Sequence, residues 1–462
     1  MKIASYCSII LLAFLGMTQI RNVMPEKNYP SYSAEWEKIN QLQSQGLRKD
    51  VINLVEQLLA RAERENNLPQ QYKCIMTLEA QLIQSDEDGV KGFITRIEKK
   101  KDKAKEPIKS LLSSVLGSAY KAVYSQSLYG GARSNITAVE QDEKDIETWS
   151  PEALILKANE NFLNSVKIEN SLDELNIDLK EIQTSQGDSM SQPYLYDMLL
   201  FRAINHFSEA QSQLPNVKSP VSREILFSTI DEFLNYKLQE PKEPQEMLVQ
   251  LFQDAIRYHK GKENHQAVIY YDLQRLKTFY AGKSDSGSKK AYIYALHSLF
   301  EKYKNKEYAG EVLFAEGELY YTRYFASAEE HDLLHCDSIM DVILKKYPSC
   351  KKAEAASKIK AGLYEKKLGI DFEEVALPQQ PIKIQVEFRN TNKLVYKIYK
   401  VNSDNRYKQN RFSRNQNFDV NKDAVLVRTK EEIWNEQKAI LNHRIDIKVD
   451  ALEIFYRNQK IL

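Results

Sequence analysis

The chain has 462 residues, of which 42% are apolar and 28% charged, so it is long enough for two or three domains with ordinary cores. Its 65 Lys and Arg residues nearly balance its 64 Asp and Glu residues, which leaves a net charge of +1. This balance excludes the strongly basic class of nucleic-acid-binding proteins, whose affinity depends on neutralising phosphates. The most basic local run, 98–106, is flanked by acids and is predicted to be a solvated helix face.

The N-terminus has the pattern of a secretory signal peptide. Lys2 precedes the apolar run Ile9–Leu15, and the small residues Gly16 and Thr18 follow it. The run is too short to span a bilayer, which needs about 20 apolar residues. We therefore predict a signal peptide over residues 1–18 and no stable membrane span. The remaining chain is expected to cross the inner membrane and to reside in the periplasm, at the outer membrane or outside the cell.

Residues 30–185 are predicted to form an N-terminal helical region, because their apolar residues recur at helical spacing. A first helix around Trp36 is expected to end at Gly46, and the next to break at 66–69, where Pro69 cannot continue a helix. Ser150 is predicted to cap a further helix that starts at Pro151. The second of these helices carries one apolar stripe: Leu47, Val51, Val55, Leu58, Leu59 and Ala62. The polar stretch 171–192 reads as an exposed loop.

Residues 193–374 are predicted to form a helical-repeat region that starts with an apolar helix over 193–207. The stretch beginning at Lys302 is similar to the stretch beginning at Lys346, with Tyr303 matching Tyr347 at an offset of 44 residues (347 minus 303). This offset suits the helical hairpins of an α-solenoid, whose repeats run from about 34 to 47 residues. The second copy resembles a tetratricopeptide-type repeat, so we predict antiparallel, TPR-like helical hairpins.

Candidate catalytic and metal-binding residues are few. In His331–Cys336, two histidines stand four residues apart, the spacing that zinc uses on a helix, but Asp332 stands where a zinc peptidase carries Glu. The sequence offers no recognisable third ligand, no phosphate-binding loop and no Gly-x-Ser-x-Gly elbow. We therefore predict a protein that is not an enzyme, with no catalytic residue, no metal site and no cofactor. The alternatives at His331 and His335 are an incidental metal site and, more distantly, a zinc peptidase.

Three cysteines remain once the predicted signal peptide is removed. Cys74 is expected to be packed in a core, beside the apolar residues of its helix. Cys336 and Cys350 could pair if their helices are adjacent, and the sequence leaves that disulfide open.

At Pro378 and Pro381 the pattern switches from helix to strand. Residues 382–388 alternate between apolar and polar side chains, as expected of a strand with one buried face. Residues 390–392 turn the chain, and 394–401 are predicted to form a hairpin with the first strand. Residues 443–450 alternate again. We therefore predict a β-domain over 380–462.

The order of these features resembles the N-terminal part of the large bacterial alpha-2-macroglobulin family. The matching stretches are Trp36–Asn67, 145–149 with the helix that follows, 195–207, 388–401 and 443–450. The resemblance implies a secreted protein with a helical region followed by macroglobulin-like β-sandwich domains. It also implies a parent function in endopeptidase inhibition or envelope defence, with peptidases or envelope proteins as partners. The family's thioester motif, Cys-x-Glu-Gln, is absent from this sequence.

A macroglobulin-like sandwich needs about seven strands and about 100 residues to cover its two inner faces. Residues 381–462 supply three clear strands and one weaker one, so we expect an incomplete sandwich whose remainder is missing from this chain. Alternatively, the hairpin uses the helices as its second layer. The predicted fold is thus mainly α: a helical-hairpin solenoid followed by a short antiparallel β segment. It would act as an extracytoplasmic interaction region, or else as a free-standing TPR-like scaffold, and the oligomeric state is not predicted.

Overall fold

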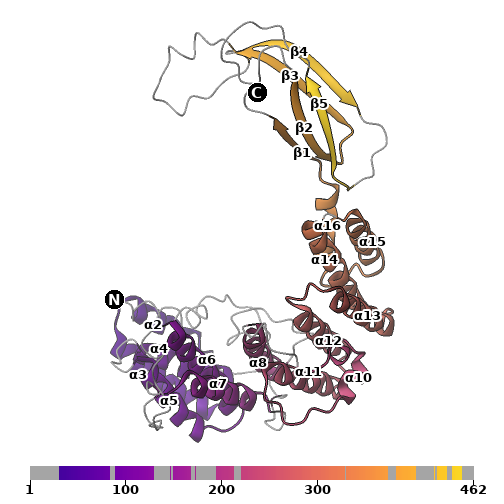
Figure 1. Cartoon of the computed structure of the whole chain (residues 1–462). Coiled ribbons are helices and arrows are strands. Elements are labelled where there is room, and N and C mark those ends of the chain that lie inside the picture. Colours follow the sequence, from indigo (N-terminus) through magenta and orange to yellow (C-terminus); the bar gives the residue numbers. More distant parts are fainter. Residues whose placement is uncertain are drawn as a thin grey trace. The chain divides into compact units, whose positions relative to one another are not determined.

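The computed structural model describes residues 31–83, 89–129, 146, 149–167, 172, 194–212, 220–327, 329–372, 381–401, 421, 424–433 and 440–449. The chain folds as two compact units, residues 1–295 and 296–462. Helices make up the first unit as far as it is described, and helices followed by strands make up the second (Figure 1). The signal peptide predicted for 1–18 lies outside the described residues, as does the polar loop predicted for 171–192 apart from Leu172. Leu172 is 2% exposed, so at this residue the expected exposed loop is wrong.

The mainly α class predicted from the sequence is confirmed. The helices of the first unit are α2 (Ser33–Ser44), α3 (Arg48–Arg64), α4 (Leu68–Ile83), α5 (Gly89–Lys103), α6 (Ile108–Tyr129), α7 (Pro151–Ser165), α8 (Leu195–Ser212), α9 (Arg223–Leu226), α10 (Ile230–Asn235), α11 (Pro244–Gly261) and α12 (His265–Tyr280). Helix α13 (Ser286–Tyr303) runs into the second unit, which continues with α14 (Ala309–Ser327), α15 (Glu330–Lys346), α16 (Ala353–Tyr364), β1 (Lys367–Phe372), β2 (Ile382–Arg389), β3 (Lys393–Val401), β4 (Ala424–Ile433) and β5 (His443–Val449).

The first helices end for local backbone reasons. Gly46 follows α2 with a φ of +72°, a conformation that glycine adopts without steric cost, so the predicted stop is confirmed. Helix α3 ends before Asn66, which has a φ of +49°. Pro69 lies in the first turn of α4, where a missing N–H costs little. The break expected at 66–69 is therefore real, but Asn66 ends one helix while Pro69 helps to start the next.

The apolar stripe of α3 packs as its periodicity predicts. Its buried side chains share a core with α2 and with Cys74 of α4, which is fully buried as expected. Leu47, which precedes α3, is the exception, since 43% of it is exposed. The predicted cap of α7 is also present, because the Ser150 hydroxyl accepts a hydrogen bond from the Ala153 N–H at 3.2 Å.

The two similar stretches of the second unit have the same turn. In the first copy, the Lys306 N–H donates to the Tyr303 carbonyl at 2.8 Å, and the Ala309 N–H donates to the Lys306 carbonyl at 3.0 Å. In the second copy the residues 44 positions later make the same two bonds, at 3.1 and 3.0 Å: Tyr347, Cys350 and Ala353. Each turn joins two helices, α13 to α14 and α15 to α16.

These two turns also pack against each other. The Tyr347 hydroxyl donates to the Lys304 carbonyl at 2.7 Å, and the Ser349 N–H donates to the Glu307 carboxylate at 2.6 Å. Gly310 makes this approach possible, because a Cβ at that position would lie 2.7 Å from the Cys350 sulfur and 2.8 Å from Tyr347 Cβ.

We expect Gly310→Ala to destabilise the second unit, because the added methyl group overpacks the contact between the turns at a cost of about 1–3 kcal/mol. Gly362→Ala is the matched control: it also lies in a helix of this unit, but its Cβ would meet nothing within 4 Å. We expect this control to be neutral or to gain up to about 1 kcal/mol from helix propensity. Urea unfolding of both variants and the unchanged chain measures the difference, and equal midpoints for the two variants would contradict the packing role of Gly310.

The strands of the second unit form two small antiparallel sheets. One has the strand order β1–β2–β5 and the other pairs β3 with β4. The strands predicted at 382–388, 394–401 and 443–450 are confirmed, whereas β1 and β4 were not predicted. Strand β1 begins at Lys367, so the change from helix to strand comes before Pro378 and inside the region 193–374 that was predicted to be helical.

The hairpin predicted between β2 and β3 is wrong, because these strands belong to different sheets. The turn between them is held by Asn390, which has a φ of +55°. Its side-chain amide donates to the carbonyls of Leu363 and Glu365, at 2.6 and 3.0 Å, and its side-chain oxygen accepts from the Ile440 N–H at 2.7 Å. The turn is thus fixed to the end of α16, and the chain continues into the second sheet.

A second sheet, and not the helices, covers the first sheet. The buried core between the sheets consists of Val386, Phe388, Leu394, Ile398 and Ile447. The helices contact this β region at its end, where Ile440 and Leu441 are buried in the core of α14–α16. The alternative in which the helices supply the second layer is therefore wrong.

Candidate interaction surface

The second sheet leaves part of the first sheet uncovered. Ile370 of β1, Val386 of β2 and Ile445 of β5 lie side by side across the strands, so their side chains share one face. Val386 is fully buried, whereas Ile370 is 50% exposed. The next pair shows the same contrast, since Phe388 is 1% exposed and its neighbour Leu368 is 51% exposed.

The reason lies in the width of the second sheet. Leu394 and Ile398 of β3 pack on the residues of β2 and β5, and neither β3 nor β4 buries the apolar residues of β1. The β4 residues paired with the apolar positions of β3 are charged: Arg428, Lys430 and Glu432. Strand β4 therefore adds no apolar cover. We call Leu368 and Ile370 the uncovered β1 face.

A second exposed apolar segment lies on β4. Val425, Leu426 and Val427 are 68%, 49% and 43% exposed, and we call them the β4 apolar segment. Within the part of the chain that the structure describes, β4 pairs with β3 alone, so its other edge offers backbone N–H and C=O groups. The register shifts between Ile398 and Tyr399, and β4 has one extra residue there, Val427.

The strands carry an excess of positive charge. The five of them hold ten Lys or Arg residues and five Asp or Glu residues, although the whole chain is nearly balanced. Ion pairs compensate part of the excess, as between Lys383 and Asp446 at 2.8 Å and between Lys393 and Glu431 at 2.6 Å. Acidic side chains on a partner would therefore strengthen its binding to these strands.

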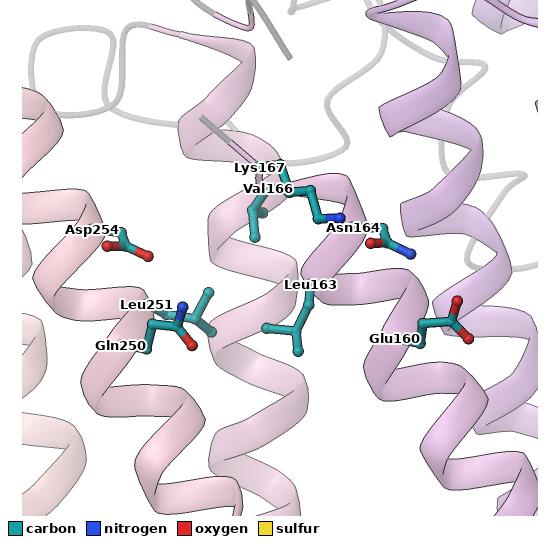
Figure 2. Close-up of a pocket in the computed structure, with 8 residues that line it drawn as sticks. All are labelled: Glu160, Leu163, Asn164, Val166, Lys167, Gln250, Leu251 and Asp254. Atoms are coloured by element: carbon teal, nitrogen blue, oxygen red, sulfur yellow. The ribbon is translucent and has the colours of Figure 1, made fainter. Parts of the chain in front are cut away.

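A cavity of about 610 Å³ lies between α7 and α11 in the first unit (Figure 2). Burial raises the pKa of Asp254, which nevertheless forms an ion pair with Arg257 at 3.5 Å. The lining mixes acidic, basic, amide and aliphatic side chains, and it does not single out one ligand chemistry: Glu160, Leu163, Asn164, Val166, Lys167, Gln250, Leu251 and Asp254.

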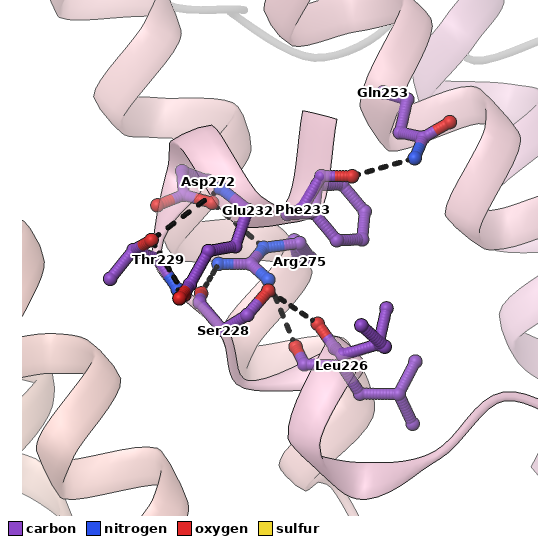
Figure 3. Close-up of polar contacts among 9 residues, drawn as sticks. Leu226, Ser228, Thr229, Glu232, Phe233, Gln253, Asp272 and Arg275 are labelled. Atoms are coloured by element: carbon purple, nitrogen blue, oxygen red, sulfur yellow. Dashed lines mark hydrogen bonds and ion pairs between the residues drawn. The ribbon is translucent and has the colours of Figure 1, made fainter. Parts of the chain in front are cut away.

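Among the described residues, the largest fully buried side chain is that of Arg275 (Figure 3). It donates to the Asp272 carboxylate at 2.7 Å and to the carbonyls of Leu226 and Ser228 at 3.0 and 2.9 Å. It also lies 4.3 Å from the ring centre of Phe233. Burial lowers the pKa of Arg275, while Asp272 opposes that shift. Arg275 thus fixes the segment of α9 and α10 to α12.

Neighbouring polar groups complete this attachment. Thr229 and Glu232 form a capping box at the start of α10. The Gln253 amide of α11 donates to the carbonyls of Phe233 and Tyr236 at 2.7 and 2.8 Å. Because these contacts satisfy buried backbone groups, the cluster has a structural role.

We expect Arg275→Met to destabilise the first unit by about 3–5 kcal/mol, since it leaves Asp272 and two carbonyls buried without their donor. Lys260→Met is the control, because the Lys260 side chain is 56% exposed and its ion pair with Asp231, at 3.2 Å, lies on the surface. Its cost should be about 1 kcal/mol or less. Denaturant unfolding measures both, and an Arg275 variant as stable as the control would refute the assigned role.

His206 is a buried neutral imidazole. Its Nε2 lies 2.6 Å from the Asn159 side-chain oxygen, which identifies Nε2 as the protonated nitrogen, and Phe162 stacks on the ring at 4.5 Å. Burial, and to a smaller extent the positive charge of Lys121, lowers the pKa of His206 to about 4.

This histidine makes stability depend on pH. The unfolded chain takes up the proton near the ordinary imidazole value of 6.5, whereas the folded chain resists it until about pH 4. Its contribution is therefore complete above pH 6.5 and is lost as the pH falls towards 4, by about 2–3 kcal/mol. Between pH 7 and 4 the unfolding free energy of His206→Gln should therefore fall by about 2–3 kcal/mol less than that of the unchanged chain. Parallel curves would show that His206 does not titrate in this way.

The structure places the histidines of His331–Cys336 on the surface of α15. The two Nε2 atoms lie 2.9 Å apart, while Asp332 is buried and accepts from Arg323 at 3.2 Å. Asp332 thus does not lie with the histidines, as a zinc peptidase requires of its base. Among the described residues there is no group of three or more His, Cys, Asp or Glu side chains that could hold a metal ion.

Cys336 and Cys350 are buried free thiols, so the disulfide left open by the sequence is absent from the structure. The basic run 98–106 is not wholly solvated, because Lys100 pairs with the buried Glu79 at 3.2 Å and Lys101 donates to Asn161 at 3.3 Å. No described helix combines the length and the apolar character that a membrane span requires.

No family model, no curated protein and no solved structure matches the chain.

Proposed function

We propose that this chain is an extracytoplasmic, non-enzymatic protein-interaction region that binds partner proteins through its strands. The observation that carries the proposal is the uncovered β1 face, where Leu368 and Ile370 are half exposed beside the buried Phe388 and Val386. Burying an exposed apolar face that continues a hydrophobic core is favourable, so this face is expected to bind a partner. The β4 apolar segment adds a second exposed surface, on a strand that pairs with β3 alone among the described strands.

The partner is expected to present an extended segment. Among the described strands β1 pairs with β2 alone, so such a segment can hydrogen-bond to the other edge of β1 through its backbone, while its alternate side chains provide specificity. Its apolar residues would cover Leu368 and Ile370, and its acidic residues would compensate the basic excess of the strands.

The sequence resemblance to the alpha-2-macroglobulin family supports peptidases or envelope proteins as the partner class. We propose that the parent function is endopeptidase inhibition or envelope defence, and that this chain supplies the TPR-like helical hairpins and part of a macroglobulin-like sandwich. Because the sequence holds no Cys-x-Glu-Gln motif, binding is non-covalent.

The test is to mix the purified chain with a panel of endopeptidases and to measure complex formation by size-exclusion chromatography and residual activity. We expect a non-covalent complex that Ile370→Gln weakens at least about tenfold, since an apolar contact at the centre of an interface is lost. Lys367→Gln is the matched control, because Lys367 lies on the opposite face of the same strand.

A covalent adduct would contradict the proposal, as would equal affinities of the Ile370 and Lys367 variants. Failure of every peptidase to bind would exclude the peptidase class. Circular dichroism confirms that both variants remain folded.

A TPR-like scaffold that binds partners through α13–α16 is the second candidate. The repeated turn at an offset of 44 residues favours it, because stacked hairpins present large binding surfaces. A chain that ends at residue 375, remains folded and keeps its binding partner would support this scaffold. We expect such a chain to be less stable, since it loses Ile440 and Leu441 from the helical core.

A further inference from the structure

The exposed histidine pair of α15 brings two imidazole nitrogens within hydrogen-bond distance of each other. His331 and His335 stand four residues apart, near the start of α15, and both are exposed. Their ring centres are 4.0 Å apart, the rings are nearly perpendicular, and one Nε2–H donates to the other Nε2 at 2.9 Å. Tyr320 of α14 stacks on the His335 ring at 5.1 Å and so restricts its orientation.

A shared metal ion fits this separation. An ion about 2.05 Å from each nitrogen would bind the two at an angle of about 90° when they lie 2.9 Å apart. That angle matches neighbouring positions of a square-planar site, which Cu²⁺ and Ni²⁺ prefer. A tetrahedral Zn²⁺ site would need the nitrogens about 3.3 Å apart, so the rings would have to separate.

The geometry points to a surface Cu²⁺ site formed by Nε2 of His331 and Nε2 of His335, with its remaining positions open to water or to a ligand from a partner. Two ligands suffice for this site, whereas the zinc peptidase considered from the sequence needs a third ligand and a base. The histidine that donates the present Nε2–H bond changes to its Nδ1–H tautomer through exchange with solvent, so both Nε2 lone pairs face the ion. Imidazole nitrogen favours Cu²⁺ over Zn²⁺ also by intrinsic affinity.

The experiment titrates the full chain with CuCl₂ and, separately, with ZnCl₂, and follows binding by calorimetry and by the electron paramagnetic resonance of Cu²⁺. We expect one Cu²⁺ per chain with two nitrogen ligands, and weaker binding of Zn²⁺. His331→Gln and His335→Gln should each weaken Cu²⁺ binding at least about tenfold, because losing a ligand costs more than losing its hydrogen-bond partner.

His297→Gln is the control, since His297 is an exposed single histidine that pairs with Glu316 at 2.9 Å. It should leave Cu²⁺ affinity and the spectrum unchanged. The proposal is overturned if either pair variant binds Cu²⁺ like the unchanged chain, or if the control loses as much affinity as they do. Both pair positions are exposed, and thermal unfolding without metal shows that the variants are folded.

Discussion

The docking of Asn390 on the end of α16 determines the arrangement of the strands. Its side chain bonds to carbonyls of Leu363 and Glu365 and to the N–H of Ile440, so one residue connects helix, turn and the approach to β5. The turn is attached to the helix, and after it the chain enters the second sheet as β3. The uncovered β1 face follows from this, since β3 packs on β2 and β5 alone.

The helices and strands of the second unit therefore depend on each other. Ile440 and Leu441 complete the core of α14–α16, and Arg389 donates to the Gly362 carbonyl at 2.8 Å. A partner that binds the strands would bind a surface held firmly by helices, which lowers the entropy lost on association. The charged groups Arg275 and Glu79 of the first unit are by contrast paired with charged residues of the same unit and stabilise the packing of helices.

The histidine pair and the β1 face are functional candidates of different kinds. A metal site depends on two nitrogens at a defined separation, whereas binding at the uncovered β1 face depends on the exposed apolar area of Leu368 and Ile370. Both lie in the second unit, and each can be removed by a substitution that leaves the other unchanged. Their roles in binding are thus separable by experiment.

The amino-acid sequence determined the helices, because the caps and stripes of α2, α3 and α7 depend on residues within a few positions of each other. It likewise determined β2, β3 and β5, whose alternation is local. The apolar residues Leu368, Ile370 and Phe372 of β1 also alternate, but they directly follow a helix, and Val425–Val427 of β4 show no alternation at all. Tertiary structure alone decided strand pairing and the uncovered face, since these depend on contacts such as Asn390 with Ile440, fifty residues apart in the chain.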